Sequence, residues 1–194
     1  GYVLTAQSGN TGGLTWAAAS GGSGGGDVTS DARQNTAAGT NAGDSFDGSA
    51  GNVHNSVYGY DAGTAITSGN ANTCIGHKAG LSIDTGADNV AIGQALQQVT
   101  GGQRNVGIGR YAGKGTGSDN VSIGANTGQD FTSAAQNISI GYLAGQNITD
   151  GTANINIGHH AYPSGNTSNE CRIGADNGST GEITKFKIPG CNFS

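Results

Sequence analysis

A short alternation of apolar and small residues recurs along most of this chain. Each copy begins with Asn and ends with Gly, in most copies four residues later. The copies between residues 89 and 158 carry Val or Ile at the second position and Ile at the fourth, as in NVAIG at residues 89–93 and NISIG at residues 137–141. Alternation with a period of two is typical of a half-buried β-strand. The pattern therefore predicts a short strand in each copy.

The copies follow one another at a nearly constant spacing. They begin at Asn35, Asn55, Asn72, Asn89, Asn105, Asn120, Asn137, Asn154 and Asn169, the last with one extra residue before its Gly. Successive glycines are 15–17 residues apart after a first interval of 20. Several copies continue with a small residue three positions after the Gly and a second apolar residue further on, as Ala79 and Ile83 do. A repeat of this length predicts a solenoid, in which each copy is one rung and consecutive rungs stack.

The expected fold is all-β: a parallel β-solenoid or β-roll of about nine rungs of 15–17 residues, each with two short strands and two turns. Helix is not expected, because no window has an apolar period of 3.6 residues and glycines interrupt every dozen residues. We assign the bulky strand residues to the structural core, with the small residues between them facing away. These predicted core residues are Val90, Ile92, Val106, Ile108, Val121, Ile123, Ile138, Ile140, Ile155 and Ile157. The leading Asn of each copy is expected to hydrogen-bond its counterpart in the next rung.

A single rod of this kind has a thin core. Each rung offers three or four small-to-medium apolar side chains for burial, against the entropic cost of ordering about 16 residues. Three rods around one axis would bury a second face of each. We therefore expect an intertwined or packed homotrimer.

The chain divides into three parts: an N-terminal segment at residues 1–34, the solenoid at 35–178 and a capping strand at 179–194. The first 20 residues predict two strands around a Gly-rich turn, the second strand bearing Trp16, and residues 20–30 predict a flexible linker. Near the C-terminus, Ile183, Phe186 and Ile188 alternate with polar residues before Pro189. Such a strand would close the end of the stack, which solenoids require.

The composition of the chain argues against several classes of binding partner. With 38 glycines, 11% charged residues and a net charge of −5, the chain has no basic footprint for nucleic acid. It contains no apolar stretch of 18 residues, so membrane insertion is not expected. Three cysteines are too few for a disulfide framework, and Cys74 is expected to be a buried small residue.

Catalytic chemistry is not expected either. The four histidines (His54, His77, His159 and His160) lack further ligands at metal-binding spacing, and the acidic residues are scattered singly over turns. We therefore expect no catalytic residue, no metal site and no cofactor, and infer that the chain is not an enzyme. Among six Asn-x-Ser/Thr sequons, the turn sites Asn147 and Asn166 are the glycosylation candidates, whereas Asn120 and Asn137 are repeat positions that should be partly buried.

The repeats resemble two families. The NVAIG strands with their Gly-rich turns resemble the head repeats of trimeric autotransporter adhesins, which form left-handed parallel β-rolls with three chains to a head. The longer period, seen in TAITSGNANTCIGHKAG at 64–80 and TGSDNVSIGANTG at 116–128, is similar to repeat regions of bacteriophage tail fibres. The C-terminal stretch from Arg172 resembles the segment preceding an intramolecular chaperone that trims itself off trimeric fibres.

This resemblance implies a structural trimeric fibre of a virion, located outside the cell, that mediates attachment to a host cell-surface receptor, with a glycan as a candidate receptor. The alternative is a trimeric bacterial surface adhesin that binds matrix or glycan and is located on the cell surface. A third class, an ice-binding solenoid, would require a regular Thr ladder. The small strand residues Ala91, Gly107, Ser122, Ser139 and Asn156 do not form one.

Overall fold

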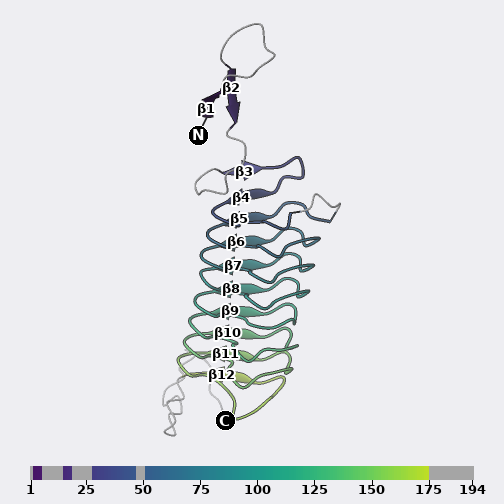
Figure 1. Cartoon of the computed structure of the whole chain (residues 1–194). Helices are drawn as coiled ribbons and strands as arrows, with labels where there is room; N and C mark the ends of the chain where they lie inside the picture. The colour runs from purple at the N-terminus through teal and green to yellow at the C-terminus, as the bar shows by residue number, and fades with distance from the viewer. Residues whose placement is uncertain (1, 6–14, 19–27, 47–50, 175–194) are drawn as a thin grey trace, which may run out of the picture.

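The structure of the protein, a computed structural model, describes residues 2–5, 15–18, 28–46 and 51–174 (Figure 1). These residues form twelve strands and no helix. Strands β1 (Tyr2–Thr5) and β2 (Thr15–Ala18) pair antiparallel, with Leu4 opposite Trp16. The two expected N-terminal strands are thereby confirmed, whereas most of the linker and the capping segment at 179–194 lie outside the described residues.

The other ten strands form one sheet in sequence order, the strands of a tall single stack in Figure 1. They are β3 (Thr29–Ser30), β4 (Thr36–Ala38), β5 (Ser56–Tyr58), β6 (Thr73–Ile75), β7 (Val90–Ile92), β8 (Val106–Ile108), β9 (Val121–Ile123), β10 (Ile138–Ile140), β11 (Ile155–Ile157) and β12 (Cys171–Ile173). All neighbours from β4 to β12 pair in parallel, residue for residue. The expected all-β parallel solenoid is confirmed, with about eight turns between β4 and β12. At about 4.8 Å per strand the stack is about 40 Å long.

Each described rung contains one three-residue strand, and not the two strands that we expected. The rest of each rung, which we call the return limb, leads from the end of one strand to the start of the next. It is joined to the return limbs of neighbouring rungs by backbone hydrogen bonds between turns, such as Gly80 N to Ala95 O at 2.9 Å. The limb pairs in β geometry only at the isolated bridge between Ala135 and Thr152 within the described residues. Glycines and turns in this limb leave no run long enough for a second strand.

The glycine that ends each strand lets consecutive rungs stack closely. Gly59 has a φ of 130°, a conformation that side-chain-bearing residues rarely adopt. A Cβ added there would lie 2.6 Å from the carbonyl oxygen of Gly76 in the next rung. The Gly at the end of the repeat is therefore required both by its own backbone and by the neighbouring turn.

The leading asparagines form a buried ladder along the stack, as expected. In a typical step, Asn72 donates from its backbone N–H and from Nδ2 to Oδ1 of Asn55, both at 3.0 Å. Asn72 Nδ2 also donates to the carbonyl oxygen of Gly86 at 2.8 Å, at the far end of the same rung. Each asparagine therefore joins its rung to the previous one and closes its own coil. Asn120 and Asn137 belong to the ladder and are buried.

Two acidic residues lie at the ends of this ladder. Asp31 accepts hydrogen bonds from the backbone N–H and the Nδ2 of Asn35, both at 2.9 Å, and so occupies the place of a preceding asparagine. At the other end, Glu170 donates its backbone N–H to Oδ1 of Asn154 at 3.0 Å. Glu170 therefore replaces the asparagine of the last copy. The extra residue that we expected after Asn169 is not an insertion, because Asn169 lies before the ladder position, with a φ of 61°.

The side chains inside the coil are the small residues at the centre of each strand. This inward column runs through Ala37, Val57, Cys74, Ala91, Gly107, Ser122, Ser139 and Asn156, and at β12 its position is occupied by the exposed Arg172. Alanines of the turns and the second apolar residue of each repeat, such as Ile66 and Ile83, complete the interior. Both of these are fully buried.

The assignment of the ten bulky strand residues to the core is wrong for the single coil. Val90, Ile92, Val106, Ile108, Val121, Ile123, Ile138, Ile140, Ile155 and Ile157 are half-buried or exposed on the outer side of the sheet. The reason is the narrowness of the coil. A Cβ on Gly80 of the facing turn would lie 2.5 Å from Cys74 Sγ, so the space opposite each strand holds only a small side chain.

Candidate functional site: the outward face of the sheet

The first and third residues of strands β4–β12 form one surface, which we call the outward face. The first outward column contains Thr36, Ser56, Thr73, Val90, Val106, Val121, Ile138, Ile155 and Cys171. The second outward column contains Ala38, Tyr58, Ile75, Ile92, Ile108, Ile123, Ile140, Ile157 and Ile173. Because the strands pair in register, both columns are continuous from rung to rung.

The outward face exposes a large amount of apolar surface. The most exposed of its large side chains are Tyr58 (37%), Ile75 (43%), Ile92 (37%), Ile138 (38%), Ile155 (36%) and Ile173 (39%). Contiguous apolar patches above a few hundred Å² mark interaction surfaces in soluble proteins.

No charged residue interrupts this surface. The two outward columns contain no Asp, Glu, Lys or Arg in β4–β12. Charges lie at the ends of the rungs, as in the exposed pair in which Arg104 Nε is 2.6 Å from Asp119 Oδ1. This hydrogen-bonded pair lowers the pKa of Asp119 and raises that of Arg104. Two copies of the outward face could therefore meet without bringing like charges together.

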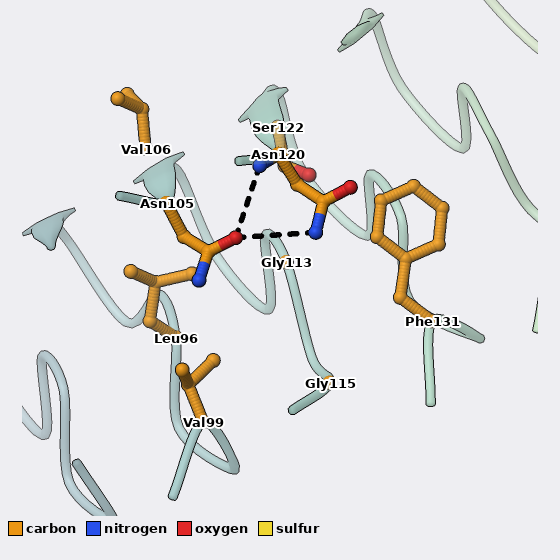
Figure 2. A pocket seen from close by; sticks show the side chains of 9 residues that line it. All are labelled: Leu96, Val99, Asn105, Val106, Gly113, Gly115, Asn120, Ser122 and Phe131. Atoms are coloured by element: carbon orange, nitrogen blue, oxygen red, sulfur yellow. Dashed lines mark hydrogen bonds between the residues drawn. The ribbon is translucent and has the colours of Figure 1, made fainter. Parts of the chain in front are cut away.

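Behind the outward face, the interior contains a small cavity at the rung of β8. The rung of β8 has Gly115 where neighbouring rungs have an apolar residue such as Val99 or Phe131. This cavity of about 10 Å³, the size of a single water molecule, lies there beside Leu96, Gly113 and Gly115 (Figure 2). Figure 2 also shows the ladder bonds from Asn120 to Asn105 at the cavity's edge.

A row of aromatic and imidazole rings follows the outward face at the last rungs. Tyr142, 44% exposed, stacks on His159 and His160 with ring centroids 5.4 and 5.5 Å away. The two imidazoles stack on each other at 4.1 Å. His159 is an exposed turn residue, whereas His160 is half-buried under these rings. The pattern of Tyr and His at the position after the strand glycine was visible in the sequence, but its stacking was not predicted.

The sequons differ in accessibility. Asn147, half-buried, donates from Nδ2 to the carbonyl oxygen of Pro163 at 3.0 Å. Asn166 is exposed, and its Oδ1 accepts the backbone N–H groups of Thr149 and Gly151 at 3.0 and 2.9 Å. Both candidate glycosylation sites thus take part in bonds between rungs.

The remaining candidate residues are dispersed. Cys74 is buried, which raises its pKa to about 12, and Cys171 is exposed in the first outward column. Within the described ranges, no three His, Cys, Asp or Glu side chains gather closely enough to hold a metal ion. Among those same residues there is no helix of the length and hydropathy that crossing a membrane requires.

Comparison with protein-family models, with curated proteins and with solved structures gave no match to this chain. The outward face and the solenoid behind it are therefore the basis for the functional proposal that follows.

Proposed function

We propose that this chain is a structural segment of a trimeric fibre that holds an attachment site away from a particle or cell surface. The observation that carries the proposal is the outward face, because a continuous, uncharged and largely apolar surface about 40 Å long suits lengthwise contact with another rod. A parallel stack of structurally equivalent rungs repeats the same type of contact at every level.

A three-fold arrangement would use both columns of this surface. Around a three-fold axis parallel to the stack, the first outward column of one chain faces the second outward column of the next, and the contact closes on itself after three chains. Each chain then uses both columns, and neighbouring rungs meet at equal height. Ile138 of one chain would pack near Ile140 of the next copy.

The fibre is proposed to belong to a virion, in the manner of a phage tail fibre, and to mediate attachment to a host cell-surface receptor. The repeat period of 15–17 residues supports this proposal through its similarity to tail-fibre repeats. The second candidate, a trimeric adhesin on a bacterial surface that binds matrix or glycan, has the support of the NVAIG strands at residues 89–93 and the ring row at Tyr142.

Gold-labelled antibodies against this chain distinguish the two candidates by electron microscopy. Label on fibres projecting from purified virus particles, with preincubated antibody blocking adsorption to host cells, is the expected result. Label on the surface of uninfected bacteria supports the adhesin instead. Label on neither structure contradicts both proposals.

A further inference from the structure

The inward and outward residues of the strands change in polarity along the stack, in opposite directions. At β6 the inward residue is Cys74 and its outward neighbours are Thr73 and Ile75. At β10 the inward residue is Ser139, and both outward neighbours are isoleucine. The interior therefore becomes more polar, and the outward face more apolar, toward the C-terminal rungs.

The buried apolar residues are also distributed unequally along the stack, with most of them in the N-terminal rungs. One continuous buried cluster covers the rungs of β5–β8 and comprises Val57, Ala62, Ile66, Cys74, Ala79, Ile83, Ala91, Ala95, Leu96, Val99 and Ala112. The second cluster, in the rungs of β9 and β10, contains only Phe131, Ala134 and Ile148. Because burial of apolar area is the main favourable term in folding, the C-terminal rungs gain less from their own interior.

Buried polar groups weaken the C-terminal interior further. Ser122 Oγ, Ser139 Oγ and both side-chain amide atoms of Asn156 are buried without a hydrogen-bond partner. The inward residues Val57, Cys74 and Ala91 of β5–β7 bring no hydroxyl or amide into the coil. A buried polar group left unpaired lowers the stability of the folded state, because it has lost its hydrogen bonds to water without replacing them.

We propose that the outward face of β9–β12 is the principal self-association surface of the chain, and that its occupant is the same surface on further copies of this chain. The proposal rests on the proposed fibre function and names the part of the outward face that holds the copies together. On this account the rungs of β5–β7 are stable through their own interior. The rungs of β9–β12 depend on apolar contacts supplied by the neighbouring chains.

The occupant follows from the surface itself. Both outward columns of β9–β12 are apolar at every position, from Val121 and Ile123 to Cys171 and Ile173. In β4–β6 the first outward column is Thr36, Ser56 and Thr73. A surface without charge, repeated in register over four rungs, is complementary to its own copy placed at the same height.

A matched pair of substitutions in the second outward column tests the proposal. Ile140→Ser in β10 and Ile75→Ser in β6 remove the same side chain at equivalent positions of the sheet. We expect Ile140→Ser to weaken self-association, measured by sedimentation equilibrium of the full chain, at least tenfold more than Ile75→Ser. An equal loss for the two variants, or a larger loss for Ile75→Ser, overturns the proposal.

Hydrogen exchange of the unaltered protein gives a readout that does not depend on the variants folding. As the protein is diluted through its association range, the backbone amides of β9–β12 are expected to lose protection first, while those of β5–β7 keep theirs. Uniform loss along the stack overturns this inference but leaves the fibre proposal intact. A folded chain that is monomeric at every concentration overturns the fibre proposal and, with it, this inference.

Discussion

Ser139 and Ile140 are consecutive residues of β10, yet Ser139 is completely buried inside the coil while Ile140 faces outward. The smaller and more polar residue occupies the interior, and the larger apolar residue lies on the surface. This relationship holds along the sheet, since the inward column is small and the second outward column is mostly isoleucine. It leaves a large part of the apolar surface outside the coil, where the proposed trimer would bury it.

A charge placed inside the coil tests the assignment of the two strand faces. We expect Ser122→Asp to lower the free energy of unfolding by about 3 kcal/mol or more, because the carboxylate would be buried without a partner. Ser133→Asp, at an exposed position in the same rung, should change the free energy of unfolding by less than about 0.5 kcal/mol. Urea unfolding followed by circular dichroism measures both. Similar tolerance of the two changes contradicts the inward placement of Ser122.

The ladder predicts a large effect from one asparagine. Asn89→Ala removes the acceptor of the Asn105 N–H and the donor to the carbonyl oxygen of Gly102, both of which are buried bonds. We expect a loss of about 2–4 kcal/mol in stability, since the partners remain buried and unpaired. Asn70→Ala is the control, because Asn70 is half-buried and outside the ladder. Thermal unfolding that shifts equally for the two variants argues against the ladder.

The strand-ending glycines should be intolerant of any side chain. Gly59→Ala combines a φ of 130° with a Cβ that would contact the next rung, and we expect it to cost about 2 kcal/mol or more. Gly165 has no heavy atom within 4 Å of an added Cβ and a backbone that needs no glycine, so Gly165→Ala should be nearly neutral. Differential scanning calorimetry of the two variants makes the comparison, and a neutral Gly59→Ala contradicts the close stacking of the turns.

The hydrogen bonds at the N-terminal end of the ladder should weaken at acidic pH. Hydrogen bonds from Asn35 lower the pKa of Asp31 below its ordinary 3.8, so the ionised carboxylate stabilises the folded end. This contribution is complete above that ordinary value and is lost as the pH falls through the lowered pKa. We expect the amide of Asn35 to exchange faster, relative to the unfolded rate, as the pH drops below 3.8, and Asp31→Asn to remove this dependence. An unchanged protection factor across that range contradicts the capping role.

Much of the fold could be predicted from the sequence because the repeat is itself structural. The spacing of the glycines gave the number of rungs, and the leading asparagines gave the ladder that aligns them. The strand faces could not be assigned in the same way, because alternation separates two faces without indicating which one is enclosed. The glycines of the facing turns, such as Gly63 and Gly80, were the available signal, since they leave room only for small residues opposite them.

The outward face was also not predicted from the sequence, because of a general expectation about large apolar residues. Large apolar residues are assigned to the interior of a chain because most proteins bury them there. In this chain Ile123 and Ile140 lie outward, and on our proposal another copy of the chain covers them. The capping roles of Asp31 and Glu170 were missed because neither matches the asparagine that they replace.

The mass of the purified chain in solution tests the central claim most directly. Sedimentation equilibrium at micromolar concentration should give a single species of three times the 19.0 kDa chain mass. Its apolar probe binding should be low, since the outward face would be covered. A folded, monodisperse species with the mass of one chain, or of two, contradicts the account.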